Sequence, residues 1–516
     1  MTLLQWVLVL SVLFAATTYG WQSNIVKYDA RSHKLTYQRD GEGNVIPDFS
    51  YSGYHSGADI PNIPVVKTLD WKGMDDHTGY IQAAIDQVSS LPINNTSQYR
   101  GALLLRPGKY NIRGTIRIRA SGVVLRGSGQ GHEEKTDTIL YALGDNPHQR
   151  TVVIAGNGKN DHWSDQVQGT KTNVINDMKV GDNVVKVEKQ SFKVGDTVVI
   201  TYPTTDAWLK SVNYGEPEGD PKWTPQDQFP IIFNRLVTAV NGNEITIDAP
   251  VFNSLKRSLS QSYVYKYDKK NTPRHIGVEN LRIDVQTNGR PDDENHAWTA
   301  LSFVGSEHVW VRRCTMIHFG FAGVDFSTTV YGTVDGVTAV RPVAITTGGR
   351  MYNFCASEAA QQILFKNCKA ADGRHHYVSN GASRASGIVF FNSTCDNNFA
   401  SSEGHRRWST GLLYDNIISK SKNLALGIYN RGNYGSSHGW SAANSVAWNV
   451  RVVNGGSICV QKPPTAQNFG IGCHGYVTGK KPPCAFSKNQ GYIEGTNKDG
   501  LEPRSLYEAQ LAQRKF

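Results

Sequence analysis

The chain of 516 residues is long enough for two to four domains or for one long repetitive domain. It carries 54 lysines and arginines against 44 aspartates and glutamates, a formal net charge of +10. The basic residues are dispersed rather than gathered in tracts, which argues against a nucleic-acid-binding arm.

The first 20 residues predict a secretory signal peptide. No charged residue precedes Lys27, an apolar stretch occupies positions 3–16, and small residues follow it. A membrane anchor is the alternative, but the stretch is short for a span and is interrupted by Gln5 and Ser11. No later segment is long and apolar enough to cross a bilayer. We therefore expect a secreted, extracellular protein with no membrane contact.

Three asparagines lie in sequence motifs that are glycosylated in secreted proteins. Asn94, Asn95 and Asn392 each open an Asn-X-Ser/Thr sequon, the acceptor sequence for N-glycans in secreted proteins. Such tripeptides are frequent by chance, so each alone is weak evidence. We expect glycosylation at these positions.

An amphipathic helix is predicted within residues 75–90, "DDHTGYIQAAIDQVSS", because Ile81, Ala84, Ile85 and Val88 recur at helical spacing. The Asp and Thr before them are capping candidates. Residues 101–130 then form short alternating strands separated by Pro-Gly and Ser-Gly turns. One helix followed by many short strands indicates a capped stack of strands.

The run "DDHTGYIQAAID…ALLLRPGKYNIRGTIRIRASGVVLRGSGQG" resembles the opening of the pectate-lyase-like, right-handed parallel β-helix superfamily. The resemblance covers about residues 70–130. It implies an all-β solenoid, a right-handed parallel β-helix with an N-terminal capping helix. It does not imply one function, because that superfamily contains lyases, hydrolases, epimerases and proteins without known activity.

A repeat in the second half supports the same fold independently. Seven segments share one plan, an alternating apolar strand followed by a polar or cysteine position. They begin at residues 276, 309, 337, 363, 388, 412 and 445, at intervals of 33, 28, 26, 25, 24 and 33 residues. This period predicts successive coils of a solenoid. Residues 150–262 follow another spacing and predict an inserted small β-domain.

The expected organisation therefore has five parts. They are a signal peptide (1–20), an N-terminal segment with the first coils and their cap (21–149), an inserted β-rich lobe (150–262), the main coils (263–465) and a C-terminal segment (466–516) that ends in a helix, "LYEAQLAQRKF".

All seven cysteines lie after residue 313, and in an oxidising compartment some of them should pair. Spacing alone does not determine the pairing, and we favour Cys459 with Cys473. Cys314 and Cys368 occupy similar coil positions and are expected to be buried small hydrophobes. The absence of CxxC pairs argues against a zinc site.

Three basic and aromatic clusters recur in the main coils: "DGRHHYVSNG" (372–381), "GHRRWSTG" (404–411) and "NRGNYGSSHGW" (430–440). Equivalent positions of successive coils stack about 4.8 Å apart, so residues about 25 apart in sequence become neighbours. The clusters should project on one side of the stack. Arginine forks hold carboxylates and aromatic faces stack on sugar rings, so this surface favours an acidic polysaccharide as partner. We expect a monomer that binds no nucleic acid.

The same residues could catalyse β-elimination at a uronic acid, which needs a group to neutralise the carboxylate, a base, and an acid for the leaving oxygen. The hypothesis assigns His376 or His405 as base, Arg374 and Arg407 as neutralisers, and Tyr377 as acid. The predicted substrate-binding residues are Arg406, Trp408, Tyr429, Arg431, His438, Trp440 and Lys462. The sequence shows no evident metal ligands and no evident cofactor, and it leaves the binding of a calcium ion as an open alternative.

Two other functions remain open. A glycoside hydrolase would need a carboxylate pair, which Asp372, Asp396, Glu403 and Asp415 could supply. A non-catalytic matrix protein would need only the charge and the aromatic rings. The "WiDH" and "RxPxxR" patterns of pectate lyases are absent, which puts pectin as substrate in doubt. Some of the candidates also fit structural roles: adjacent histidines 375 and 376 point to opposite faces of a strand, and Trp440 fits packing.

Overall fold

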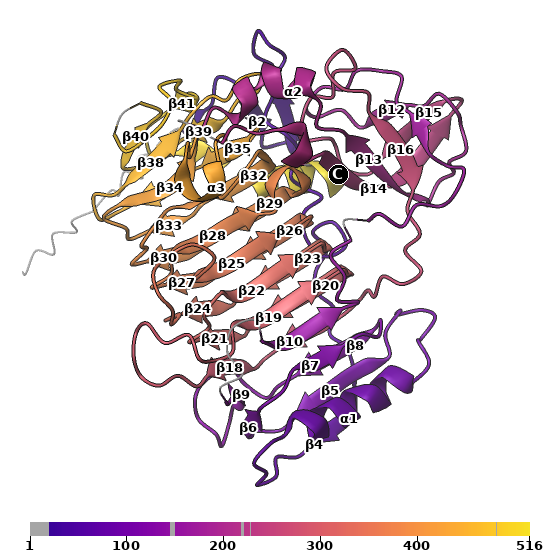
Figure 1. The fold of residues 1–516 in the computed structure, drawn as a ribbon, viewed down its shortest axis with the longest axis vertical. Helices are drawn as coiled ribbons and strands as arrows, with labels where there is room; N and C mark the ends of the chain where they lie inside the picture. The colour runs from indigo at the N-terminus through magenta and orange to yellow at the C-terminus, as the bar shows by residue number, and fades with distance from the viewer. Residues whose placement is uncertain are drawn as a thin grey trace, which may run out of the picture.

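The structure, a computed structural model, describes residues 20–144, 150–161, 163–217, 221–227, 229–480 and 482–515. Residues 1–19 of the predicted signal peptide lie outside the described residues. Within the described chain, strands wind into a parallel β-helix of three sheets beside a separate antiparallel lobe (Figure 1). The predicted fold class is confirmed. None of the helices described is long and apolar enough to cross a membrane.

The three parallel sheets of the stack are called I, II and III below. Each coil contributes one strand to sheet II, then one to sheet III and then one to sheet I. Each strand pairs in parallel with the equivalent strand of the coil before it. Sheet I contains, among the described residues, β7 (Ile116–Ile118), β10 (Thr151–Gly156), β19 (Thr299–Val304), β22 (Ala322–Ser327), β25 (Tyr352–Ser357), β28 (His375–Asn380), β31 (Ser402–Gly404), β34 (Leu424–Ile428), β38 (Ser457–Val460) and β40 (Tyr476–Thr478). Sheet II contains, in the same residues, β4 (Val65–Leu69), β5 (Gly101–Leu105), β8 (Val123–Arg126), β17 (Gly277–Glu279), β20 (Glu307–Arg312), β23 (Val330–Asp335), β26 (Gln361–Lys366), β29 (Ser386–Phe391), β32 (Ser409–Asp415), β35 (Ala442–Ala443), β36 (Val446–Trp448), β39 (Phe469–Ile471) and β41 (Tyr492–Glu494). Sheet III contains β6 (Gly108–Ile112), β9 (Thr138–Ala142), β18 (Arg282–Val285), β21 (Thr315–Ile317), β24 (Thr338–Val340), β27 (Lys369–Ala371), β30 (Thr394–Asp396), β33 (Ile418–Ser419) and β37 (Arg451–Val452).

The interior of the stack is apolar because the inward side chain of each strand meets its equivalent in the next coil. Phe365, Phe390 and Tyr414 of sheet II stack with ring centroids 5.0 Å apart at each step. Cys314 and Cys368 lie buried in the same core, as predicted. One of the seven predicted segments is not equivalent to the others: the segment at 337 is β24 of sheet III, and β23 is the sheet II strand of that coil.

Asparagines make the turn between sheet II and sheet III in most coils. Asn280, Asn367, Asn392, Asn416 and Asn449 all have a positive φ, which asparagine tolerates better than most residues. The Asn392 side-chain nitrogen donates to Asn367 Oδ1 at 2.7 Å, and Asn449 donates to Asn416 in the same way. Glycosylation at Asn392 stays a prediction, and a glycan there would compete with the hydrogen bond from Asn392 to Asn367. Glycosylation at Asn94 and Asn95 also stays a prediction, and both residues are exposed.

Helix α1 (Thr78–Ser90) covers the first coil, as the sequence indicated. Its buried residues are the predicted Ile81, Ala84, Ile85 and Val88. They pack on the first strands of the stack and belong to the same core. The open N-terminal end of the solenoid is thereby shielded from water.

The inserted lobe is a six-stranded antiparallel sheet in the described residues. Its elements are β11 (Thr172–Asn173), β12 (Val184–Lys186), β13 (Thr197–Tyr202), α2 (Asp206–Ser211), the 3₁₀ turns η1 (Asn213–Gly215) and η2 (Pro225–Asp227), β14 (Ile231–Asn241), β15 (Glu244–Ile247) and β16 (Tyr263–Lys266). Strand β10 falls within the interval predicted for the lobe but belongs to the stack, and β39 to β41 extend the stack beyond residue 465.

The lobe docks on the outer face of sheet II, where Leu364, Val389 and Leu413 meet it. Gly387 and Gly411 sit at left-handed positions of this sheet, with φ of 68° and 63°. The Phe252 side chain occupies the space that a Cβ at Gly411 would need, whereas a Cβ at Gly387 would first meet the Gln362 side chain. Glycine at position 411 therefore lets the lobe approach the sheet.

The two ends of the described chain meet beside the lobe. Strand β1 (Trp21–Gln22) pairs with β42 (Leu501–Glu502), and the hairpin of β2 (Val26–Asp29) and β3 (Lys34–Tyr37) packs against α4 (Leu506–Lys515). The predicted C-terminal helix is confirmed. The remaining short elements are η3 (Ala382–Arg384) and α3 (Tyr434–Ser437).

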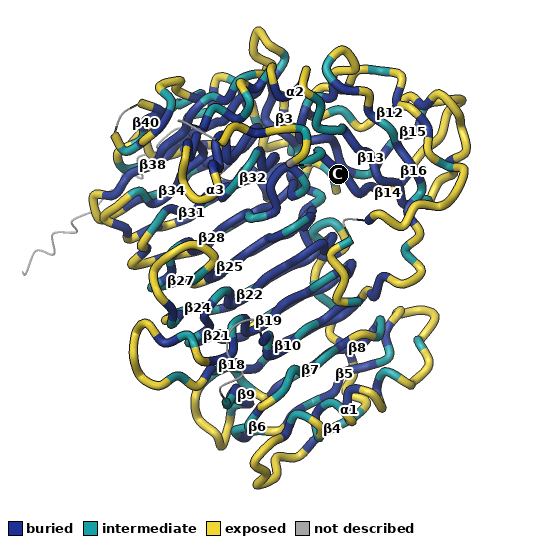
Figure 2. The backbone as a smooth tube through the Cα atoms, viewed as in Figure 1, coloured by how far each residue is buried: buried dark blue, intermediate teal, exposed yellow. Residues whose placement is uncertain are grey.

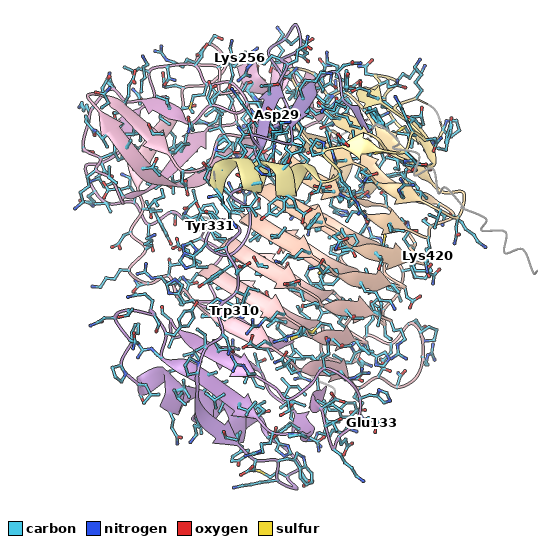
Figure 3. The ribbon with its side chains drawn as sticks, turned by 180° about the vertical axis from the view of Figure 1, so that it is seen from behind. Asp29, Glu133, Lys256, Trp310, Tyr331 and Lys420 are labelled. Carbon is cyan, nitrogen blue, oxygen red and sulfur yellow. A yellow bond between two sulfur atoms is a disulfide. The ribbon has the colours of Figure 1, made fainter. Side chains whose placement is uncertain are left out.

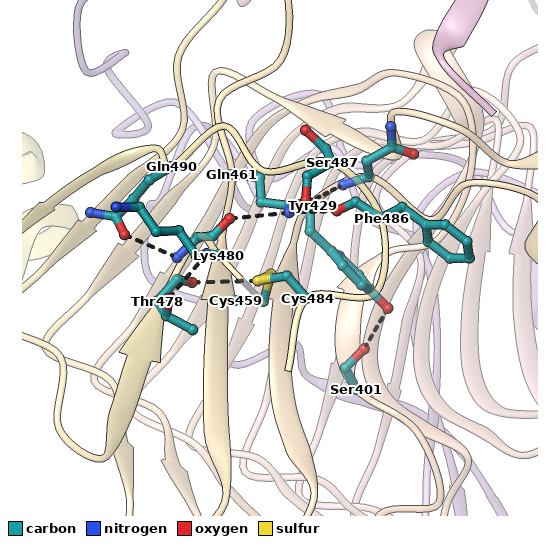
Figure 4. Close-up of a disulfide and its surroundings, with 12 residues drawn as sticks. Ser401, Tyr429, Cys459, Gln461, Thr478, Lys480, Cys484, Phe486, Ser487 and Gln490 are labelled. Carbon is teal, nitrogen blue, oxygen red and sulfur yellow. Dashed lines mark hydrogen bonds between the residues drawn. A yellow bond between two sulfur atoms is a disulfide. The ribbon is translucent and has the colours of Figure 1, made fainter. Parts of the chain in front are cut away.

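One disulfide joins Cys459 of β38 to Cys484, 25 residues further along (Figure 4). The predicted partner of Cys459, Cys473, is instead a free buried thiol on the interior side of the stack. Cys459 points outward from sheet I, whereas Cys473 points inward, so coil geometry separates the two sulfurs.

Candidate functional site

A column of outward-pointing side chains crosses sheet I. Asp325, Cys355, Val378 and Glu403 are paired one above another on β22, β25, β28 and β31. Their sequence neighbours, such as Phe326, point into the core. The column ends at the carboxylate of Glu403 on β31, the strand that pairs with β28 on one side and with β34 on the other.

Glu403 is surrounded by positive and neutral nitrogen donors. Its Oε1 lies 2.8 Å from His405 Nδ1, 3.3 Å from His375 Nδ1 and 3.2 Å from Arg431 NH1. Its Oε2 accepts from the Tyr429 hydroxyl at 3.1 Å. We call Tyr352, His375, Glu403, His405, Tyr429, Arg431 and His438 the Glu403 cluster.

The hydrogen bonds show which ring nitrogen of His405 carries the proton. Glu403 accepts only, so the 2.8 Å contact requires the proton on Nδ1. Arg431 then donates to the His405 backbone oxygen at 2.6 Å and to Glu403. His405 Nε2 is left as an acceptor, 3.2 Å from the Tyr352 hydroxyl. The result is a relay from Tyr352 through His405 to Glu403.

Burial keeps the imidazoles of the cluster neutral. Burial, together with Arg431 and His438, lowers the pKa of His405 well below 6.5, and burial lowers the pKa of His375 likewise. For His438, burial and Arg431 lower the pKa to about 3. Burial raises the pKa of Tyr352, which therefore keeps its proton. At neutral pH, His405 is a free base beside a protonated phenol.

His375, Glu403 and His405 could hold a metal ion by distance alone, since one donor atom of each lies within 4.8 Å of the others. The chemistry does not fit. Arg431 NH1 lies 3.0 Å from His405 Nδ1 and 3.2 Å from Glu403, so a guanidinium already occupies the cation position. A divalent ion bound there would face this charge at contact distance. We assign the group to an ion-pair network.

Half-buried arginines surround the cluster, which itself reaches the surface only slightly. His405 is 5% exposed and Arg431 6%. Arg374 lies over the Tyr352 ring, 5.6 Å from its centroid, and Arg406 donates to the Asn380 backbone at 3.3 Å. The strands of sheet I are buried here while the loops beside them are exposed (Figure 2).

The inserted lobe fixes the loop that carries Arg431 and His438. The Trp440 amide donates to Gly215 of the lobe at 2.9 Å, and its indole donates to Glu216 at 2.8 Å. Trp223 of the lobe donates to the Ser437 backbone at 3.1 Å. The lobe thus positions two members of the Glu403 cluster.

The structure gathers several predicted residues on this one face and separates others. His405, Arg431, His438 and Tyr429 belong to the cluster, and Arg374 and Arg406 lie at its border. Arg407 lies to one side, over the Phe229 ring at 4.5 Å.

His376 and Tyr377 are corrected as catalytic candidates, because both are buried in the stack. His376 Nε2 accepts from the Gly373 amide, and burial lowers its pKa to about 3. Tyr377 stacks on Phe354 in the core and donates to the Thr394 backbone at 2.8 Å. Neither side chain can meet a polymer on the outer face.

Trp408 and Trp440 are corrected as substrate-binding residues, whereas the role of Lys462 stays a prediction. Trp408 and Trp440 are buried beneath the lobe, where Trp408 packs against Trp208. Lys462 forms an ion pair with Glu42 at 2.9 Å. Tyr429 is buried as well and supports Glu403 instead of stacking on a sugar.

The sequence analysis missed Tyr352, gave Glu403 only as one of four possible hydrolase carboxylates, and did not place His375 in the candidate site. The missing signal was the register between coils. When "VDFS", "FCAS" and "YVSN" are placed one above another, Asp325, Cys355 and Val378 fall in one outward column, and Glu403 continues it.

No family model and no curated protein matches the chain. Among solved structures, it is similar to ORF18 of Geobacillus virus E2 (11% identity, TM-score 0.37), covering 83% of this chain and 59% of that one. It is similar to the tailspike protein gp49 of Pseudomonas phage LKA1 (12% identity, TM-score 0.34; 81% and 74% covered). It is also similar to an alginate lyase of a Paenibacillus species (9% identity, TM-score 0.40; 85% and 99% covered). With scores below 0.5, the fold assignment rests on the strand order and register.

Proposed function

We propose that this protein is a polysaccharide lyase that cleaves an acidic, uronate-containing polysaccharide by β-elimination. The observation that carries the proposal is the relay in which His405 lies between Glu403 at 2.8 Å and the Tyr352 hydroxyl at 3.2 Å. It stands on the outer face of the sheet, among arginines that suit an anionic sugar.

The relay supplies the base and the acid of the reaction. His405 Nε2 takes the proton from C5 of the uronate, and Glu403 stabilises the imidazolium that forms. As the C4–O bond breaks and the C4–C5 double bond forms, Tyr352 gives its proton to the leaving oxygen. Tyr352 then recovers a proton from His405 Nε2, which restores the resting state.

The arginines stabilise the negative charge that develops on the substrate during the proposed reaction. Removal of the C5 proton places negative charge on the neighbouring carboxylate, and cations at that position lower the barrier. Arg374 and Arg406 lie half-buried at the border of the cluster, where they can meet a carboxylate from solvent. Arg431 is held by Glu403 and adds positive charge beneath them.

Two rival functions make different demands on the site. A hydrolase acts through a pair of carboxylates, whereas the groups in contact with Glu403 are imidazoles, a guanidinium, a phenol and the Ser401 hydroxyl. A binding protein needs no proton relay. The Tyr352–His405–Glu403 arrangement therefore favours elimination.

A panel of alginate, pectate, glucuronan and glycosaminoglycans tests the proposal. We expect one of them to give a rise in ultraviolet absorbance as unsaturated chain ends form. New reducing ends without that absorbance would establish hydrolysis instead. Measurable binding without any product would establish a binding protein.

The pH dependence of turnover should carry the signature of a buried base. Because the pKa of His405 is lowered well below 6.5, its base form persists as the pH falls through 6.5. We expect kcat/KM to stay level from about pH 8 to about pH 6 and to fall only in more acidic solution. A pH–rate profile that falls with an apparent pKa near 6.5 would contradict the assignment of His405 as base.

We expect Tyr434 to stack on a sugar ring of the substrate. It is the aromatic residue of the 430–440 loop that solvent reaches, 46% exposed, and it lies over Arg431, 5.7 Å from the guanidinium carbon. Phe486 holds the ring edge-on at 4.8 Å. Because stacking binds substrate and transition state alike, Tyr434→Ala should raise KM about tenfold and leave kcat unchanged.

Steady-state kinetics with the susceptible polymer measure this effect. Tyr434→Phe should restore the wild-type KM. Tyr476→Ala, at a tyrosine 57% exposed on the last described strand of sheet I, is the matched control. An unchanged KM in Tyr434→Ala would remove the platform from the site.

A further inference from the structure

Three histidines from distant parts of the chain meet at the edge of sheet II, away from the Glu403 cluster. His55 comes from the N-terminal segment, His275 from the start of a coil, and His308 from β20. The His55 ring stacks on His308 with centroids 4.1 Å apart, and His308 stacks on Tyr331. Tyr331 and Trp310 mark this region on the reverse side of the molecule (Figure 3).

The two Nε2 atoms of His55 and His275 lie 3.1 Å apart. Zinc–imidazole bonds of about 2.0 Å at tetrahedral angles place two ligand nitrogens about 3.3 Å apart, so the observed separation matches that of two ligands of one ion. We infer that His55 and His275 form a binding site for a divalent transition-metal ion such as Zn²⁺.

The rings around His275 hold its imidazole in place: those of His55, Tyr99 and His308 lie with centroids 5.1, 5.5 and 5.8 Å from it.

A cavity of about 210 Å³ adjoins His55 and provides room for water. His308, Glu307, Lys269 and Arg235 also line it. The Glu307 carboxylate lies 3.3 Å from the Lys269 ammonium and offsets its charge. His55 is exposed, so an ion can reach the pair from solvent. Water in the cavity would complete the coordination.

Bound metal would join the N-terminal segment to the solenoid. His55 belongs to the stretch that precedes the first coil, whereas His275 is bonded through its amide to the His308 backbone. An ion that binds only the folded arrangement raises its stability. The expected result is a Zn²⁺-dependent rise in the melting temperature.

Isothermal titration of the metal-free protein with Zn²⁺ alone tests the inference, with thermal unfolding as a second readout. We expect one ion to bind the wild type, and His55→Gln and His275→Ala each to weaken binding at least tenfold and abolish the thermal shift. His55→Gln changes an exposed residue and keeps a hydrogen-bonding side chain, so its fold should be retained. His132→Ala, at an exposed histidine beside Glu133, is the matched control.

Three results would overturn the inference. The first is an absence of binding by the wild type, which would leave a hydrogen bond between two neutral imidazoles. The second is wild-type affinity in both His55→Gln and His275→Ala. The third is binding that His405→Ala removes and His55→Gln leaves intact, which would place the ion in the Glu403 cluster. Neither readout depends on turnover, so a failed lyase assay leaves this inference unaffected.

Discussion

Replacement of His405 by alanine should lower kcat on the susceptible polysaccharide by about 10²- to 10⁴-fold, the usual contribution of a positioned general base. The variant removes the nitrogen that would take the C5 proton and the link between Tyr352 and Glu403. Because substrate still meets Arg374 and Arg406, KM should change little. The initial rate of ultraviolet absorbance increase measures the loss.

His132→Ala, at an exposed histidine outside the cluster, should keep full activity. Circular dichroism of His405→Ala should match the wild type, because a small side chain at this outer position leaves the interior stack untouched. Wild-type turnover in a folded His405→Ala protein would exclude the proposed relay and return the search for a base to His438.

Replacement of Trp408 by alanine should lower the free energy of unfolding by about 3 to 5 kcal/mol, the cost of emptying the site of a buried aromatic side chain. Trp408 is 1% exposed, packs edge-on against Trp208 of the lobe, and donates to Asn253 Oδ1 at 2.9 Å. The truncation would leave both a cavity and an unpaired amide oxygen. Denaturant titration of the wild type and the variant measures the difference.

Trp71→Ala is the matched control, since Trp71 is 47% exposed and its loss should cost much less. Trp408→Phe should recover part of the stability by refilling the space without the hydrogen bond. If Trp408→Ala kept wild-type stability and lost affinity for polysaccharide, Trp408 would be the stacking residue that the sequence suggested.

The solenoid could be predicted because its pattern of alternating apolar residues repeats along the sequence. Each repeat has the same physical cause, the apolar interior that every coil must fill. Every coil must present apolar residues inward, so the alternation around 363, 388 and 412 appears in the strands β26, β29 and β32. The coil at 330 was missed because β23, "VYGTVD", carries Gly332 at an inward position and reads less apolar than the following sheet III strand.

The candidate site was harder to predict. Whether a side chain on the outer face of a sheet is buried depends on which other segment of the chain packs over it. Histidines 375 and 376 are adjacent, and only the register that pairs His375 with Tyr352 of the preceding coil shows that His375 is the one facing outward. The tryptophans were misjudged for the same reason: the lobe that covers Trp408 and Trp440 comes from a segment more than 150 residues earlier.

The pairing of β8 with β17 joins Val124 to Gly277, although the whole lobe lies between them in sequence. Within the stack, the coils after residue 276 pair with the coils next to them in sequence and can add one by one to any nucleus. The first coils cannot join that column until the intervening chain has closed a long loop, an entropic barrier that grows slowly with loop length. Assembly should therefore proceed in two kinetic phases, with the N-terminal cap docking last.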